Sequence, residues 1–112
     1  MCANGLVKVE LVVYELAWAA GFFDGEGTTS YLKKGSWMGP RMSVAQNNPE
    51  TLERFQLAVQ CGKIYEHTTR KGMYSWNCQK KEDVEKVLNM LWPFLSNQKK
   101  EQALSVYKLI GK

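Results

Sequence analysis

The most continuous apolar stretch of the chain lies near its N-terminus. Residues 12–24 are apolar on nearly every side of a helical projection, so they predict a deeply buried helix. Gly25 and Gly27 are expected to end this helix, because glycine is unfavourable inside helices. Glu26 would then lie between the two glycines, just past the helix end.

Three later segments also have helical spacing. Residues 48–50, Asn-Pro-Glu, are typical of a helix start, and the amphipathic pattern that follows is expected to end at Gly62. Residues 84–95 form a second amphipathic segment, which Pro93 should kink or end. The last predicted helix, residues 97–110, directs four side chains inward: Ala103, Leu104, Tyr107 and Ile110.

Between these helices, period-two alternation and β-branched or aromatic residues predict four strands. They cover residues 28–34, 41–46, 63–67 and 73–78. The element order is therefore α-β-β-α-β-β-α-α. Two consecutive hairpins of this kind predict an α+β fold, with one four-stranded antiparallel sheet, helices on one of its faces and an extra C-terminal helix. Tyr74 and Trp76 are expected to belong to the core. A length of 112 residues suits one domain, residues 1–112.

The charge distribution indicates that the two strand pairs are basic. The net charge is +4, but residues 1–26 have a net charge of −3, while the two strand pairs, residues 27–49 and 61–80, have +3 each. Antiparallel sheets with helices on one face usually leave the other face in water. The exposed sheet face is therefore expected to be basic, and a β-ribbon of this kind fits the major groove of DNA.

The cysteine content and the apolar runs indicate the cellular compartment. Three cysteines, Cys2, Cys61 and Cys78, are an odd number without metal-type spacing, which argues against a disulfide framework. No apolar run approaches the roughly 20 residues of a membrane span, and the N-terminus has no signal-peptide pattern. We therefore expect an intracellular protein, in a bacterial or phage cytoplasm or an organelle, that is neither secreted nor bound to a membrane.

The end of the first helix has two unusual features. Ala17, Gly21 and Gly25 recur every four residues, so they form a stripe of small residues on one helix face. Such a stripe lets a second helix approach closely, although packing on the sheet of the same chain would also use it. Asp24 and Glu26 place two carboxylates next to this stripe, where the helix dipole does not favour them. A hard cation such as Mg²⁺ would stabilise crowded carboxylates there, and a solvated turn is the plainer alternative.

These residues resemble the signature of a known family. Residues 19–27, AAGFFDGEG, are similar to the motif of the LAGLIDADG homing endonucleases, with Ala19 in place of the usual leucine and Glu26 in place of the commoner aspartate. The αββαββα order is also that of the family. The resemblance implies that two such helices pack together, and that the final acid, Glu26, binds the catalytic divalent metal, Mg²⁺ or another cation such as Mn²⁺.

Two further catalytic positions follow from the resemblance. Gln46, at the end of the second strand, is similar to a polar residue that orders active-site water in the family. Lys99 resembles a basic residue near the scissile phosphate, with Lys100 as the alternative because the register is uncertain by one residue.

The motif occurs once, so the resemblance implies a homodimer. The first helix would form its interface through Ala17, Gly21, Asp24 and Gly25, and the dimer would make a double-strand break at a long pseudo-palindromic DNA site. A non-cleaving RNA-splicing cofactor (maturase) or a DNA-binding regulator on the same scaffold is the alternative function. A small α+β interaction domain with a basic face is a third.

Outward side chains of the strands and loops are the expected DNA contacts. Arg41 would pair with guanine and Asn77 with adenine, which are favoured side-chain–base pairs. The phase of the first strand is ambiguous from the pattern, and the family register favours Ser30 and Lys34 outward. The full predicted set is Ser30, Lys34, Arg41, Ser43, Lys63, Tyr65, His67, Arg70, Lys71, Ser75 and Asn77.

Overall fold

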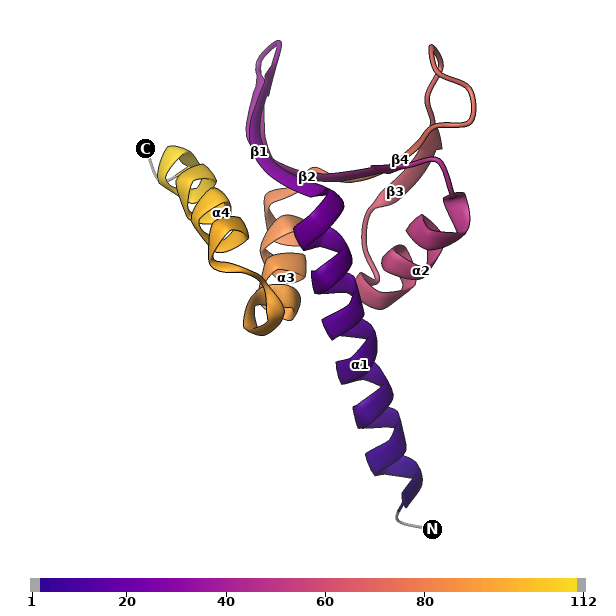
Figure 1. The fold of residues 1–112 in the computed structure, drawn as a ribbon. Helices are drawn as coiled ribbons and strands as arrows, with labels where there is room; N and C mark the ends of the chain where they lie inside the picture. The colour runs from indigo at the N-terminus through magenta and orange to yellow at the C-terminus, as the bar shows by residue number, and fades with distance from the viewer. Residues whose placement is uncertain (1–2, 111–112) are drawn as a thin grey trace.

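The computed structural model describes residues 3–110 and confirms the predicted element order (Figure 1). The elements are α1 (Ala3–Glu26), β1 (Gly27–Lys34), β2 (Trp37–Gln46), α2 (Pro49–Val59), β3 (Lys63–Glu66), β4 (Tyr74–Cys78), α3 (Lys81–Leu91), the 3-10 turn η1 (Trp92–Phe94) and α4 (Asn97–Ile110). No helix of the described residues combines the length and the apolar run needed to cross a membrane.

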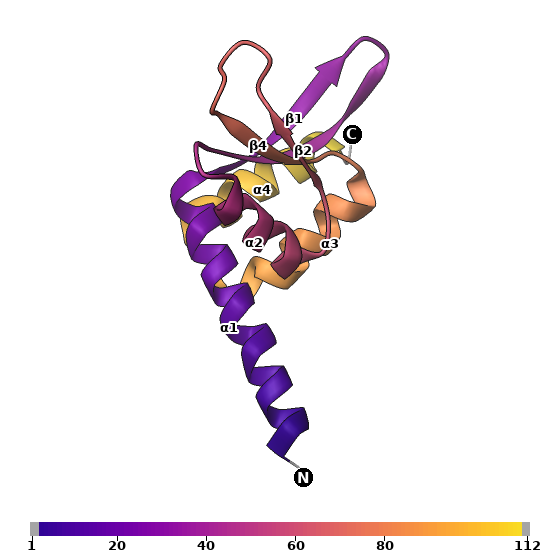
Figure 2. The same ribbon diagram turned by 90° about the vertical axis from the view of Figure 1, so that its right-hand side faces the viewer.

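One antiparallel sheet organises the fold, with strand order β1-β2-β4-β3. The two hairpins therefore meet through β2 and β4, whose pairing runs from Met42 opposite Cys78 to Gln46 opposite Tyr74. The sheet curves into a concave surface, and the hairpin turns rise at either end of it (Figures 1 and 2). The helices cover the other, convex side, as predicted for an α+β fold with helices on one face.

The core lies between the convex side of the sheet and the helices. Trp76 and Phe55 meet edge to face, with ring centroids 4.8 Å apart, and both are fully buried. Phe23 from α1 stacks on Phe55 at 6.3 Å, so one aromatic group joins α1, α2 and β4. Tyr74 packs against this core from the same side of β4, which confirms its predicted place.

The start of α2 is as predicted, but its end is not. The Asn48 side chain accepts a hydrogen bond from the backbone N–H of Glu50 at 2.9 Å, as an N-cap should. The helix ends at Val59 rather than at Gly62, because Gln60 adopts the left-handed conformation (φ 54°) that closes it. Gly62 has a different function. Its φ is +89°, and a Cβ there would overlap the Trp76 indole.

The prediction that the first helix is deeply buried is wrong for its N-terminal part. The helix α1 begins at Ala3 and continues through Gly25 to Glu26, so it is longer than predicted and Glu26 is its last residue. Its N-terminal half projects away from the body (Figure 1). Apolar side chains there are largely exposed, at 57% for Leu11, 58% for Val12 and 66% for Tyr14.

Farther along, a charged and aromatic contact joins α1 to α2. The Arg54 guanidinium donates two hydrogen bonds to the Glu15 carboxylate, at 2.9 and 3.0 Å. The same guanidinium lies 3.9 Å from the centroid of the Trp18 ring, which in turn stacks on Phe22. These hydrogen bonds hold the pKa of the Glu15 carboxyl below its ordinary value.

The C-terminal region follows the prediction with one exception. Pro93 ends α3 in a 3-10 turn, and α4 begins at Asn97. Ala103 and Val106 are buried and Tyr107 is half-buried, but Leu104 is 50% exposed, so its predicted inward position is wrong. Val106, three residues after Ala103, takes the inward position instead, because residues three apart share a helix face. The side chain of Ile110 lies outside the described part.

Candidate nucleic-acid interface and active site

The concave face of the sheet is defined by the strand register. Ser30 of β1 pairs with Arg41 of β2, and Ser43 pairs with Asn77 of β4. On the other side of β4, Lys63 pairs with Asn77 and Tyr65 with Ser75. Side chains of directly paired residues lie on the same face of a sheet. The opposite face contains buried Met42, Val44, Trp76, Cys78 and Thr29, which settles the phase of β1 in favour of Ser30 outward.

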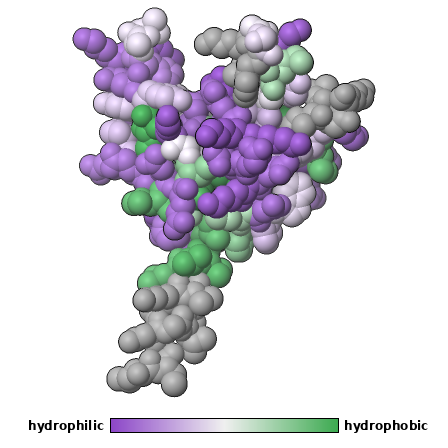
Figure 3. Space-filling view, turned by 180° about the vertical axis from the view of Figure 1, so that it is seen from behind, coloured by the Kyte–Doolittle hydropathy of each residue, from purple (hydrophilic) through white to green (hydrophobic). Residues whose placement is uncertain are grey.

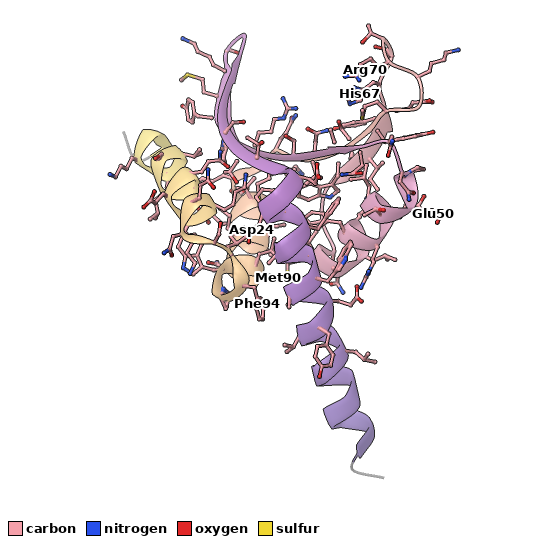
Figure 4. All side chains as sticks on the ribbon, viewed as in Figure 1. Asp24, Glu50, His67, Arg70, Met90 and Phe94 are labelled. Carbon is pink, nitrogen blue, oxygen red and sulfur yellow. The ribbon has the colours of Figure 1, made fainter. Side chains whose placement is uncertain are left out.

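The predicted DNA contacts of this face therefore lie on two parts of the sheet. Lys63 and Tyr65 are exposed on β3, while Arg41 and Ser43 are half-buried near the middle of the sheet. Arg70 and Lys71 are exposed in the β3–β4 turn, and Arg70 lies at the rim (Figure 4). The side chain of Lys34 lies outside the described residues.

Two predicted contacts also bind one another within the β3–β4 hairpin. The His67 ring Nε2 and the Ser75 hydroxyl share a hydrogen bond, and the His67 backbone N–H donates to the Met73 carbonyl at 2.8 Å. These bonds hold the base of the turn that presents Arg70 (Figure 4). His67 therefore has a structural function in this hairpin besides any contact with a ligand.

Asn77 lies on the concave face by register, as predicted, but its side chain is only 7% exposed. Its Oδ1 accepts a hydrogen bond from Arg41 Nε at 3.1 Å.

The convex side of the sheet receives the end of α1. Glu26 is exposed at the end of α1, one residue before β1 begins. Asp24 is half-buried, and its carboxylate accepts hydrogen bonds from the Ser96 backbone N–H, at 3.1 Å to Oδ1 and 3.2 Å to Oδ2, and from the Ser96 hydroxyl at 3.1 Å. The two acids therefore differ. Asp24 joins α1 to the start of α4, whereas no hydrogen bond to the Glu26 carboxylate is found among the side chains and backbone that the structure describes.

The two candidate lysines have separate surroundings. Lys99 Nζ donates a 2.6 Å hydrogen bond to the carbonyl of Gly27, the residue after Glu26. Lys100 Nζ instead lies 5.5 Å from the centroid of the Trp92 ring. The structure therefore brings Lys99, and not Lys100, to the end of α1.

Gln46 is the least directly connected of the three proposed catalytic residues. It ends β2 opposite Tyr74 and is half-buried. By alternation with Val44 it lies on the convex side, where α1 also ends. No hydrogen bond joins Gln46 to Glu26 or Lys99 within the described chain.

The small residues of α1 remain uncovered. Gly21 and Gly25 are exposed, and a Cβ added at either would have no heavy atom within 4 Å outside the local helix. Ala17 is half-buried. Packing on the chain's own sheet therefore does not explain this stripe at its two glycines.

A family model for the LAGLIDADG endonucleases matches residues 19–110. The chain belongs to this family. The match begins in the AAGFFDGEG segment and extends through α4, so it covers the acid at the end of α1 and the sheet alike.

Solved structures with this LAGLIDADG fold share little sequence identity with the chain. An archaeal intron-encoded homing endonuclease, I-Vdi141I, complexed with DNA, is 23% identical, with a TM-score of 0.65 over 72% of this chain and 55% of the other. I-CvuI in complex with its target is 19% identical, with a TM-score of 0.70 over 86% and 66%. I-CeuI, a group I intron-encoded homing endonuclease complexed with DNA, is 18% identical, with a TM-score of 0.71 over 88% and 54%. The chain thus spans about half to two thirds of these proteins.

Carboxylate chemistry at the LAGLIDADG helix end fits a hard cation. Glu26 offers charged oxygen ligands, which Mg²⁺ and Mn²⁺ prefer. Within the described residues, however, no cluster of three His, Cys, Asp or Glu side chains could hold a metal by itself. Ligands beyond Glu26 would have to come from water, from phosphate or from a second copy of the chain.

Two of the three cysteines, Cys61 and Cys78, belong to or pack against the hydrophobic core. Cys61 and Cys78 are free thiols with their Sγ atoms 3.7 Å apart, while Cys2 lies outside the described residues. Burial, with the nearby Cys61, raises the pKa of the Cys78 thiol, so it stays protonated.

Several contacts of the site were not predicted from the sequence. Gln102 of α4 accepts a 2.9 Å hydrogen bond from the Thr29 backbone N–H, and Ser96 binds Asp24. Both contacts join residues more than 70 positions apart, which periodicity does not detect. A serine one residue before the predicted start of α4 was the only local signal, since serine is a favoured N-cap.

Proposed function

We propose that the chain is a site-specific DNA endonuclease that makes a double-strand break as a homodimer, by hydrolysis of phosphodiester bonds with a divalent metal. The observation that best supports this is the end of α1. There, an exposed glutamate without a hydrogen-bond partner among the described residues stands beside an uncovered glycine face and a lysine. Family membership supports the same activity, and intracellular DNA would be the substrate.

The concave face would bind the duplex. Lys63, Arg70 and Lys71 are exposed on it or at its rim, and they would contact phosphates and set the register. Polar side chains nearer the middle, such as Arg41 and Ser43, would contact base edges in the major groove. Phosphate contacts supply affinity, and base contacts supply specificity.

Glu26 would hold the divalent cation, Mg²⁺ or another such as Mn²⁺. When bound, this cation would polarise a phosphoryl oxygen and help a water molecule to attack the phosphorus. Lys99, held next to Glu26 by the Gly27 carbonyl, would offset negative charge that develops on the phosphate. Gln46 would order the attacking water by hydrogen bonding.

A dimer would complete the site. One chain supplies one Glu26, and cutting two strands requires two such carboxylates. The stripe of Ala17, Gly21 and Gly25 would form the contact between two α1 helices, because exposed glycines allow close approach of helix backbones. Asp24, at the same helix end, would support the interface from its bond to Ser96. A two-fold axis between the helices would match a pseudo-palindromic site.

The test begins with a target. A duplex library with a randomised centre is selected for binding without Mg²⁺, and the selected duplex is then incubated with Mg²⁺ or with EDTA. The wild-type chain should cut both strands in Mg²⁺ only. Glu26→Gln should bind the duplex but leave it intact. Glu50→Gln removes an exposed glutamate at the start of α2 instead and should cut like the wild type (Figure 4).

Equal cleavage by wild type and Glu26→Gln would contradict the assigned role of this residue. Specific binding by the wild type without cleavage under any divalent metal would instead favour a non-cleaving protein, such as a maturase or a regulator. The absence of any selected sequence would overturn the DNA-binding assignment itself.

A further inference from the structure

We infer that Asn77 is a positioning residue that orients Arg41 to read one guanine in each half-site, rather than a reader of adenine. This inference rests on the proposed DNA-binding function. It starts from an inter-strand hydrogen bond in the middle of the concave face, from Arg41 Nε on β2 to Asn77 Oδ1 on β4, with a length of 3.1 Å.

The direction of this hydrogen bond determines which groups of Asn77 remain available. A guanidinium has only donors, so the amide must present its oxygen, and not its NH₂ group, to Arg41. Bidentate reading of adenine needs both the oxygen and the NH₂ group of an asparagine. Because Oδ1 is engaged by Arg41 and the side chain is only 7% exposed, Asn77 is poorly placed for such a contact.

The same bond leaves the outer end of Arg41 free. Nε is held by Asn77, so the two terminal nitrogens, Nη1 and Nη2, remain as paired donors. Two parallel donors match the O6 and N7 acceptors of guanine in the major groove. Arg41 would therefore approach guanine with the end of its guanidinium.

The sheet register explains why Asn77 can fix this orientation. Asn77 lies directly between Ser43 on β2 and Lys63 on β3, and Arg41 is the diagonal neighbour two residues from Ser43. A diagonal neighbour is within reach of a long side chain. Burial between two strands immobilises the amide, so forming the bond restricts the many rotamers of arginine before DNA binds. Preorganisation of this kind lowers the entropic cost of binding.

The test measures base preference with four duplexes that differ at one position of the selected target. The position is identified as the guanine whose preference disappears in Arg41→Ala. At that position the wild type should prefer guanine roughly five- to a hundredfold, the range of a good bidentate contact. Asn77→Ala should lose most of this preference while the preference at other positions stays.

Asn77→Asp provides the decisive second variant. It keeps an acceptor oxygen for Arg41 Nε, so it should retain the guanine preference even though its negative charge weakens binding to all duplexes. Asn89→Ala makes the same chemical change at an exposed site on α3 and should change neither quantity. Thermal unfolding of each variant separates loss of preference from loss of fold.

The inference is overturned if Asn77→Ala keeps the full guanine preference, or if Asn77→Asp loses it as completely as the alanine variant. It is also overturned if Asn77→Ala binds all four duplexes more tightly, because Asn77 would then hold Arg41 back. If the wild type selects no sequence at all, the proposed function fails together with this inference. If the wild type selects a specific sequence but substitution of Asn77 does not change its base preference, this inference alone fails.

Discussion

Neighbouring residues of the same type have different functions at the end of α1. Asp24 and Glu26 are two positions apart, but only Asp24 is used to hold α4, through Ser96. Lys99 and Lys100 are adjacent, but only Lys99 reaches the Gly27 carbonyl. The resemblance to a family leaves the register between these lysines uncertain by one residue, and only Lys99 lies at the end of α1.

Substitution of Lys99 and of Lys100 should have different effects on cleavage. Lys99→Met should reduce the cleavage rate by about tenfold or more, because the loss of a charge that stabilises a transition state costs at least that much. Binding of the selected duplex should change little. Lys100→Met, with the same chemistry one residue away, should cleave normally. Single-turnover cleavage and a separate binding titration measure the two effects, and a larger defect in Lys100→Met would contradict the placement.

Ser96 is predicted to act on stability. Its hydroxyl accepts the Lys99 backbone N–H at 3.3 Å and donates to Asp24, so it caps α4 and joins it to α1. Ser96→Ala should lower the free energy of unfolding by about 1 kcal/mol, the usual cost of losing an N-cap. Ser105→Ala, inside the same helix, serves as the control in urea unfolding. Equal effects of the two changes would contradict the capping function.

At the scale of elements, the sequence pattern predicts helix and strand positions well and burial less well. Residues 97–110 were predicted as a helix with the observed bounds, because capping and periodicity are local. The apolar character of residues 12–14 predicts deep burial, but these residues lie on an exposed part of α1. An apolar stretch indicates side chains whose burial is favourable. It does not indicate whether the same chain or a second one buries them.

The glycine face of α1 leads to a prediction about assembly. Gly21→Leu should not disturb the isolated chain, because a Cβ there meets no atom within 4 Å, and loss of a helical glycine is worth about 0.5–1 kcal/mol of added stability. The same side chain should block a close helix pair, so sedimentation should show a monomer where the wild type is a dimer. Ser105→Leu, on α4, should leave the dimer intact. A wild-type monomer at micromolar concentration would contradict the proposed assembly.

The contact between α1 and α2 should depend on pH. The pKa of the Glu15 carboxyl is lowered in the folded chain, mainly by the hydrogen bonds from Arg54, so its contribution to stability is present above the ordinary glutamate pKa of about 4.3 and disappears as the pH falls through the lowered value. Glu15→Gln should therefore melt below the wild type at neutral pH, and this difference should shrink toward about pH 3. Glu53→Gln removes the same charge from an exposed glutamate of α2 and serves as the control. A difference that is constant with pH would contradict this account.

On the face seen from behind, hydrophilic side chains cover most of the body, and an apolar band marks the place where α1 leaves it (Figure 3). The basic side chains on the concave face and the exposed end of α1 are both needed for the proposed activity. The fold followed from the order of local patterns, and the basic face followed from the charges of the strand pairs. The pairings Arg41–Asn77 and Lys99–Gly27 did not, because strand register and helix packing bring them together across 36 and 72 residues.

In the proposed homodimer, each protomer cuts one DNA strand with its own Glu26. The most direct measurement uses a mixed dimer of wild type and Glu26→Gln, purified through two different tags and incubated with Mg²⁺ and a supercoiled plasmid that contains the selected target. We predict that the mixed dimer converts the plasmid to nicked circles, while the wild-type dimer makes linear DNA. The dimer with Glu26→Gln in both protomers should leave the plasmid supercoiled. Linear DNA from the mixed dimer at the wild-type rate would contradict the claim.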